Sequence, residues 1–308
     1  MTVLAVDVGG TKMAAALVDA SGAVVRRDQT ATAADDPWQA LTAMLDRLID
    51  DVAVEGVGIG CAGPVVWPVG EVSPLNIPAW RGFPLRARLA ERYPGVPVRL
   101  HNDGAVFAVG EHWKGAAVGV GDMLGMVVST GVGGGLVLGG RLYDGGTGNA
   151  GVIGHVGADP AGPPCVCGGQ GCLESLACGP ATVEWAQGRG SSASDGVELA
   201  SLAADGDEVA LAAFARSGAA IGRVVAWVAT LLDVRMVVIG GGLSQSGSPL
   251  WDPLLDGFAE HAQLPFLDGV RVVPSALGAD AGLVGAAALV LAGERYWSPD
   301  LRHDTLGS

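Results

Sequence analysis

One pattern occurs twice in this chain: a short apolar strand, a glycine-rich turn and a second apolar strand. The first copy reads VLAV, DVGGTK, MAAALVD from Val3 onward, and the second reads LGMVV, STGVGGG, LVLGG in the middle of the chain. Apolar runs separated by glycine turns are typical of buried strands joined in hairpins. We therefore expect two similar halves, and a length of 308 residues fits two domains of about 100 to 200 residues each.

The segments around these hairpins predict an alternating α/β chain. DPWQALTAMLDRLID has its apolar residues on one helical face, with Asp36 as N-cap and Pro37 at the first helical position. GVGIGCAG and PVRLHND are expected to be buried strands with polar or glycine-rich ends, and ligands bind at such strand ends. We expect a surface loop leading into a helix over 187–208, one or two helices over 209–232, and a frayed tail over 297–308.

Charge and composition exclude several classes of function. The chain has 18 lysines and arginines against 32 acids, a net charge of -14, which argues against binding a polyanion such as DNA. The amino terminus has no basic leader, and no uninterrupted apolar run reaches the roughly 18 residues of a membrane span. We expect a cytoplasmic protein without nucleic-acid or membrane partners, in which five cysteines are thiols or metal ligands.

The glycine turns predict a phosphate-binding site. In DVGGTK, Asp7 ends a strand, and the two glycines allow the backbone to approach a ligand closely. Thr11 then supplies a hydroxyl and Lys12 a positive charge, which suits a phosphate group with a metal ion held by the carboxylate. The Walker pattern GxxxxGK[ST] is absent from this turn. A plain hairpin is the alternative, but a second such turn favours a polyphosphate held from both sides. The expected residues for ATP and Mg²⁺ are Asp7, Gly9, Gly10, Thr11, Lys12, Thr130, Gly131 and, in a third glycine-rich strand end, Gly241. A plain strand-turn-helix is an equal alternative for this third segment.

The sequence HNDG follows a predicted strand and has two interpretations. Asn-Asp-Gly is common in turns, and a simple turn is one interpretation. In the other, Asp103 is a general base that accepts a proton from a hydroxyl nucleophile, and Asn102 orients the same substrate. Asp7 suits the role of base poorly, because a nearby metal ion would keep it ionised and weakly basic.

One stretch, HVGADPAGPPCVCGGQGCLE, contains a histidine, three cysteines and a closing glutamate. A set of unconnected thiols is the alternative to a metal site, but the spacing C-x-C-x4-C and the interleaved glycines favour a closed tetrahedral zinc site. Such a site leaves no open position for water, so the zinc is expected to be structural and to stiffen the loop that presents Glu174. The predicted ligands are His155, Cys165, Cys167 and Cys172.

These motifs together resemble the ROK family (repressors, open reading frames, kinases) over residues 3 to about 290. The motifs are DVGGTK, HND, STGVGGG, GHVGADPAGPPCVCGGQGCLE and ALGADAGLVGAA, in that order. The resemblance implies an α/β fold of two actin-like ATPase domains around a central cleft, and ATP-dependent phosphorylation of a hexose at its 6-hydroxyl. It also implies a homodimer or homotetramer. We expect the first domain at 1–112, joined by a helix at about 288–297, and the second, with the zinc loop, at 113–287.

The resemblance also assigns roles to individual residues. Asp103 is expected to be the catalytic base, and His155 to bind zinc through one nitrogen while its other edge faces the sugar. The residues implied to bind the sugar are Asn76, Asn102, Asp103, His155 and Glu174.

Val152 departs from the family pattern, because glucokinases of the family usually have a glutamate three residues before the zinc histidine. Some relatives acting on N-acetylmannosamine also lack this glutamate, so an amino or N-acyl hexose such as kanosamine or N-acetylmannosamine is an alternative substrate.

Two other classes of protein stay open. A ROK repressor would carry a DNA-binding helical domain before the first strand, whereas here that strand begins at residue 3. The second class is a catalytically silent sugar sensor. The presence of all the residues expected for phosphoryl transfer argues against it, namely Asp7, Lys12, Asp103 and Thr130.

Overall fold

The structure is a computed structural model that describes residues 1–32 and 35–297. The chain divides into two compact units, and each is described by itself. Of the described residues, the first unit comprises 1–32, 35–121, 135–151 and 279–297, and the second comprises 122–134 and 152–278. The predicted domain boundaries at residues 112 and 287 stay a prediction.

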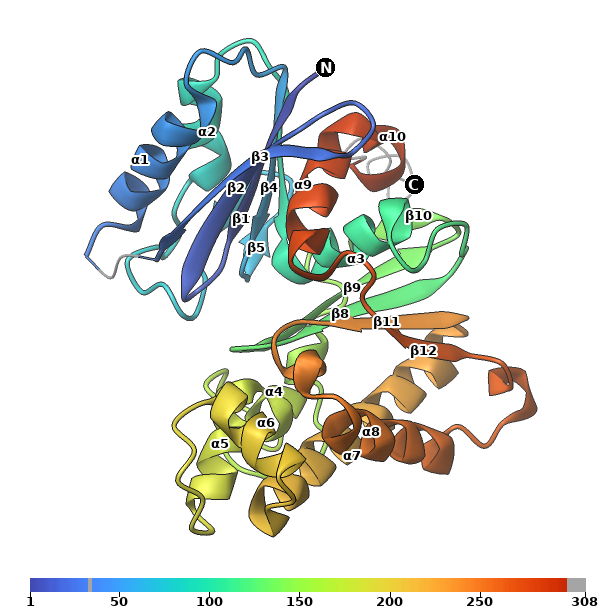
Figure 1. The fold of residues 1–308 in the computed structure, drawn as a ribbon. Helices are drawn as coiled ribbons and strands as arrows, with labels where there is room; N and C mark the ends of the chain where they lie inside the picture. The colour runs from blue at the N-terminus through green and yellow to red at the C-terminus, as the bar shows by residue number, and fades with distance from the viewer. Residues whose placement is uncertain (33–34, 298–308) are drawn as a thin grey trace. The chain divides into compact units, whose positions relative to one another are not determined.

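The first unit is built on a five-stranded sheet of order β3-β2-β1-β4-β7 (Figure 1). β1 and β2 form the predicted hairpin, closed by a hydrogen bond from the Gly9 N–H to the Lys12 carbonyl. β4 and β7 continue the sheet parallel to β1, which brings the carboxyl ends of three strands to one edge. The strands are β1 (Val3–Val8), β2 (Lys12–Val18), β3 (Val24–Ala31), β4 (Gly56–Cys61) and β7 (Val98–Asn102), with a small separate pair β5 (Val65–Val66) and β6 (Glu71–Val72).

Alternate residues of β1 enter two different cores. Leu4 and Val6 pack in a core with residues of α1 and α2, whereas Val3 and Ala5 pack with residues of α3 and α9. Figure 1 shows these helix pairs on opposite faces of the sheet. The parallel strands are therefore covered on both sides, as their continuous apolar sequence requires. The helices of this unit are α1 (Pro37–Ile49), α2 (Leu85–Arg92), α3 (Asp103–Lys114), α9 (Ala281–Leu291) and α10 (Gly293–Tyr296).

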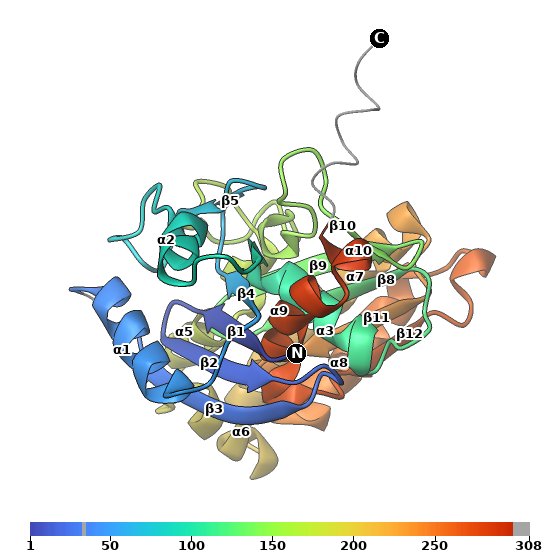
Figure 2. The same cartoon turned by 90° about the horizontal axis from the view of Figure 1, so that it is seen from above.

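Helices α3 and α9 cross at very short range, and Figure 2 shows them side by side. A Cβ on Gly285 would lie 1.8 Å from the Val106 carbonyl oxygen, and one on Gly110 would lie 2.2 Å from that of Ala281. Only glycine permits this backbone contact. The crossing fixes the start of α3 relative to the sheet edge.

The second sheet repeats the order of the first, as β10-β9-β8-β11-β12. β9 and β10 are antiparallel, and β8, β11 and β12 are parallel. Figure 1 shows α7 and α8 on one side of β11 and β12. The bounds are β8 (Met123–Val128), β9 (Val132–Leu138), β10 (Arg141–Tyr143), β11 (Met236–Gly240), β12 (Arg271–Pro274), α4 (Leu173–Ala177), α5 (Gly179–Gln187), α6 (Gly196–Ala204), α7 (Glu208–Leu232) and α8 (Ser248–His261).

Most elements predicted from the sequence are confirmed, with one adjustment. α1 begins at Pro37, and Asp36 caps it by accepting the Gln39 N–H at 2.9 Å. The second glycine turn is shorter than STGVGGG suggests, because β9 already begins at Val132. Residues 209–232 belong to a single helix, α7. The predicted frayed tail lies, from residue 298 on, outside the described residues.

Helix α7 is long and apolar enough to cross a membrane by length and composition alone, although polar residues interrupt its apolar sequence. Of its most apolar 18-residue window, 61% is buried. The helix packs against α8 along its length and also contacts α4, α5 and α6. A core helix of the second unit accounts for this apolar sequence.

Candidate active site

Asp7 and the turn after it lie at the sheet edge of the first unit. Burial raises the pKa of Asp7 to about 7, and the nearby carboxylate of Asp103 adds to this effect, whereas Lys12 and Arg27 oppose it. The carboxylate also lies against the start of α9, where a Cβ on Gly282 would be 2.7 Å from its Oδ2. A buried carboxylate beside a second one favours a bound cation.

Gly10 is required for a reason that the sequence did not indicate. A Cβ at Gly10 would lie 2.5 Å from the Cβ of Asn76, so the predicted phosphate turn packs directly against the loop that carries Asn76. Arg81 holds that loop by donating hydrogen bonds to the carbonyls of Pro74, Leu75 and Ile77. The first unit thus brings one predicted sugar ligand into contact with one predicted nucleotide residue.

Asn102 and Asp103 form the junction between β7 and α3, so the simple-turn interpretation of HNDG is wrong. Asn102 caps the helix by accepting the Gly104 N–H at 3.0 Å, and Asp103 is its first residue. Asp103 Oδ1 also accepts the Gly104 N–H, at 2.7 Å. Gly63, in the loop after β4, approaches the Asn102 amide so closely that a Cβ would lie 2.6 Å from its Nδ2. These contacts fix both side chains at the sheet edge near Asp7.

Sequence reasoning missed two hydrogen-bonded contacts of the loop after β10, one with the end of β7 and one with β5. His101 is buried, and its Nε2 lies 2.9 Å from Asp144 Oδ1, while its Nδ1 accepts the backbone N–H of Asn102 at 2.8 Å. Asn149 pairs with both the N–H and the carbonyl of Val65, at 3.0 and 2.9 Å. A histidine inside a buried strand was the only available signal, because such a side chain requires polar partners.

The second unit places its own glycine turn and Gly241 at the ends of two parallel strands. Ser129 and Gly131 close the turn after β8 through the Ser129 N–H and the Gly131 carbonyl, at 2.9 Å. Gly241 has a φ of +95°, and a Cβ there would lie 2.3 Å from the Val128 carbonyl oxygen. Thr130 is exposed at the tip of the turn. The predicted residues Thr130, Gly131 and Gly241 are therefore neighbours within this unit.

The predicted zinc ligands also converge within the second unit. Their four ligand atoms lie within 4.8 Å of one another, with Cys165 Sγ 3.6 Å from His155 Nδ1 and Cys167 Sγ 3.7 Å from Cys172 Sγ. Two atoms that are each about 2.3 Å from one ion at a tetrahedral angle are separated by about 3.8 Å. The donor set and its spacing fit zinc. Cys61 and Cys178 are buried and lie outside this cluster.

Glu174 has a contact that its predicted role as a sugar ligand did not include. It lies in the first turn of α4, two residues after Cys172, and its Oε2 accepts the backbone N–H of Val132 at 2.8 Å. A Cβ at Gly131 would lie 2.7 Å from the same oxygen. Glu174 is therefore bonded to the glycine turn of the second unit.

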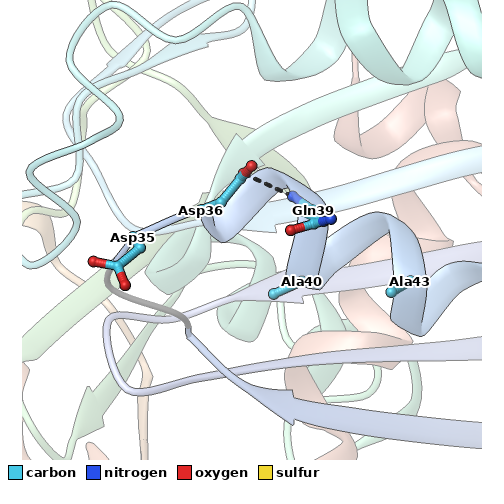
Figure 3. A pocket seen from close by; sticks show the side chains of 5 residues that line it. All are labelled: Asp35, Asp36, Gln39, Ala40 and Ala43. Atoms are coloured by element: carbon cyan, nitrogen blue, oxygen red, sulfur yellow. Dashed lines mark hydrogen bonds between the residues drawn. The ribbon is translucent and has the colours of Figure 1, made fainter.

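Two open hollows of the described surface are lined by other residues than those predicted for the site. One, of about 400 Å³, lies at the start of α1, where Figure 3 shows Asp36 bonded to the Gln39 N–H. The other, of about 450 Å³, is lined by Arg27, Asp28 and Gln29. None of the predicted site residues lines either hollow.

A chain of two similar α/β sheets, with carboxylates and glycine turns at the strand ends, has the architecture of an actin-like phosphotransferase. Residues 3–292 match the ROK family, and the chain belongs to that family. It is 32% identical over 310 residues to a glucokinase of Thermotoga maritima, with 94% of this chain and 97% of the relative covered. It is 35% identical over 294 residues to an N-acetylmannosamine kinase of Shigella flexneri, with 94% and 98% covered.

A solved structure is similar over the same length. The ROK family glucokinase from Streptomyces griseus, in complex with glucose and AMPPNP, has a TM-score of 0.85 and 33% sequence identity, with 94% of this chain and 99% of that chain covered. The predicted fold, α/β with two actin-like domains, is confirmed.

Proposed function

We propose that this ROK chain is an ATP-dependent sugar kinase that transfers the γ-phosphoryl group of ATP to the 6-hydroxyl of a hexose, as a glucokinase does. Full-length similarity to glucokinases and N-acetylmannosamine kinases supports a sugar kinase that uses ATP. The junction of β7 and α3 is the observation that carries the proposed chemistry, because it holds Asn102 and Asp103 at the same sheet edge as Asp7.

In the proposed reaction, Asp103 accepts the proton of the sugar hydroxyl as its oxygen attacks the γ-phosphorus, and ADP leaves. Asn102 orients the hydroxyl, and Asn76, His155 and Glu174 bind other parts of the sugar. A half-buried aspartate at the start of a helix, held by the Gly104 N–H, has a fixed position for this role.

MgATP is proposed to bind through the glycine turns of both units and through Gly241. Asp7 would position Mg²⁺, and the raised pKa of its buried carboxyl supports this, because a cation offsets both the burial and the repulsion from Asp103. Thr11 and Thr130 supply hydroxyls, Lys12 supplies a cation, and the backbone of Gly9, Gly10 and Gly131 approaches the phosphates.

A structural Zn²⁺ is proposed at His155, Cys165, Cys167 and Cys172, where it would hold the loop closed without taking part in the reaction. Within this loop, Gly171 is packed so tightly that a Cβ would lie 1.5 Å from the Asp159 carbonyl oxygen. The cluster leads directly into α4 and Glu174. The metal would thereby stiffen the segment that presents a proposed sugar ligand.

An amino or N-acyl hexose is the second candidate substrate. Val152 occupies the position where family glucokinases usually have a glutamate, and relatives that are N-acetylmannosamine kinases are as similar to this chain as the glucokinase is. We also propose a cytoplasmic homodimer or homotetramer without nucleic-acid or membrane partners. The net charge of -14 supports one part of this proposal, because it disfavours binding to a polyanion such as a nucleic acid.

A coupled assay of ADP release tests this proposal over glucose, mannose, N-acetylmannosamine, N-acetylglucosamine, glucosamine and kanosamine. We expect sugar-dependent turnover with at least one of them. Specific operator binding at low salt, without sugar-dependent turnover, would instead support a repressor.

A further inference from the structure

Glu174 contacts the nucleotide-binding half of the proposed site even though its proposed ligand is the sugar. Its Oε2 accepts the Val132 N–H at 2.8 Å, at the point where the glycine turn becomes β9. Gly131, one residue earlier, has no side chain, and a Cβ there would lie 2.7 Å from the same oxygen. The Glu174 carboxylate is therefore hydrogen-bonded to the end of the turn that carries Thr130.

The contact is rigid because backbone bonds hold both partners. The Leu173 N–H donates to the Val156 carbonyl at 2.9 Å, which ties the start of α4 to the segment that carries His155. Gly154 in this segment packs on β9, where a Cβ would lie 2.0 Å from the Val132 carbonyl oxygen. The proposed zinc loop, α4 and the glycine turn thus form one continuous packed assembly within the second unit.

The two oxygens of Glu174 differ in their surroundings. Oε2 is bonded to Val132, whereas no hydrogen bond to Oε1 is present among residues 1–32 and 35–297, and the side chain is half-buried. A carboxylate has two oxygens and can accept from different donors at each. Oε1 can therefore accept a hydroxyl while Oε2 keeps its bond to the turn.

We propose that Glu174 couples the binding of sugar and nucleotide, with Oε2 positioning the Thr130–Val132 turn for the phosphates of ATP and Oε1 accepting a hydroxyl of the sugar. The inference rests on the proposed sugar kinase function and adds to it a second task for this carboxylate. The Val132 N–H is taken up by this bond, so it orders the turn and does not bind phosphate.

Thermodynamic linkage gives the coupling a definite consequence. A group that orders the sites of two ligands changes the affinity for each, and the coupling is reciprocal. A carboxylate that only binds sugar leaves nucleotide affinity unchanged when no sugar is present. Nucleotide affinity without sugar therefore separates the two roles of Glu174.

The test is calorimetric titration of the zinc-loaded full chain with Mg·AMPPNP in the absence of sugar. Glu174→Ala is expected to weaken binding at least about fivefold, at the lower end of typical coupling. Glu174→Gln keeps an acceptor for the Val132 N–H and is expected to stay within about twofold of wild type. Glu184→Ala, which removes an exposed carboxylate of α5 that has no role in the proposed site, is the matched control and should not change the affinity.

The reciprocal variant is Gly131→Ala, whose new Cβ would displace the Glu174 carboxylate. It should weaken binding of the sugar with the highest turnover at least about fivefold when no nucleotide is present. Gly242→Ala is its control, because φ is -61° there and the nearest atom, Ser129 Oγ, would be 3.7 Å from the Cβ. Zinc content and a thermal melt establish that each variant is folded.

Two results would overturn the inference. One is a folded, zinc-loaded Glu174→Ala variant that binds Mg·AMPPNP as tightly as wild type does. The other is a Gly131→Ala variant with unchanged sugar affinity. Failure of the proposed function is a different result, because then the wild type itself neither binds Mg·AMPPNP nor releases ADP with any sugar of the panel.

Discussion

Asp7 and Asp103 lie at the ends of two strands, β1 and β7, on either side of β4. Their carboxyls influence each other, since the charge of Asp103 contributes to the raised pKa of Asp7. The two are not equivalent, because Asp103 begins a helix and is bonded to Gly104, whereas Asp7 is half-buried within β1 and lies against Gly282. This difference supports the assignment of Asp103 as base and Asp7 as the carboxylate near the metal.

Replacing Asp103 with asparagine tests the first assignment. The amide keeps the size of the side chain but cannot accept the proton, so kcat should fall by about 10²–10⁴, while affinity for Mg·AMPPNP is retained. Steady-state kinetics and nucleotide titration measure the two quantities. A variant with near wild-type kcat would show that another group takes the proton.

The raised pKa of Asp7 predicts how stability depends on pH when neither nucleotide nor Mg²⁺ is present. The folded chain keeps this proton up to about pH 7, whereas the unfolded chain releases it near 3.8, so the free energy of unfolding falls as pH rises between these values. The complete loss is at most about 4 kcal/mol, at 1.36 kcal/mol per pH unit.

Asp7→Asn removes this titration. From pH 5 to pH 8 the variant should therefore gain up to about 3 kcal/mol of stability relative to wild type, as measured by urea unfolding. The two proteins share their remaining titratable groups, which largely cancel in the difference. A difference that is the same at both pH values would contradict a raised pKa for Asp7.

Val152 predicts substrate preference. If it faces the sugar, one hydroxyl lacks a charged acceptor, and such a hydrogen bond contributes roughly 1.5–3 kcal/mol. Val152→Glu should then raise kcat/KM for glucose by about one to two decades relative to the best amino or N-acyl sugar, since about 1.4 kcal/mol is a factor of ten. An unchanged ratio in a folded, zinc-loaded variant would mean that this residue does not contact the substrate.

At the scale of elements, the proposed zinc loop is the segment whose sequence predicts its structure most completely. Cys165, Cys167 and Cys172 converge with His155 because glycines allow the chain to fold back between them, and Gly168 and Gly171 have positive φ. Short-range geometry of this kind is encoded locally. The bond from Glu174 to Val132 is not, because it joins residues 42 positions apart and depends on how α4 packs on β9.

Mass spectrometry under native conditions should find about one zinc per chain. Cys167→Ala should lose the metal, and sugar affinity should fall with it, because the loop that presents Glu174 loosens. Cys178→Ala is the matched control, since this buried cysteine lies outside the cluster, and it should keep the zinc. An undialysed, chelator-free wild-type preparation without zinc would rule out the site.

The loop after β10 shows what sequence reasoning could not find. His101 of β7 bonds to Asp144, and Asn149 pairs with the backbone of Val65 in β5, so this loop is tied to two distant parts of the chain. Each residue is ordinary in its local sequence. Their partners are set by tertiary packing, which periodicity and turn chemistry do not report.

At the scale of the whole chain, the duplicated hairpin was sufficient to predict two similar sheets. Both have the same order, in which two antiparallel strands are followed by two parallel ones. The contacts that glycines allow were not predictable in detail. Gly10 looked like a residue for phosphate binding, yet its immediate neighbour is Asn76, because a missing Cβ does not reveal what occupies its space.

The central claim is ATP-dependent phosphorylation of a hexose at its 6-hydroxyl, and the most direct measurement is phosphorus–proton NMR of the reaction product. The protein is incubated with MgATP and glucose, and in parallel with N-acetylmannosamine and with kanosamine. We predict one ADP per sugar phosphate formed, with the phosphorus coupled to the protons on carbon 6, and little product from Asp103→Asn. Binding of nucleotide and sugar without any sugar phosphate, or a phosphate on another carbon, would contradict the account.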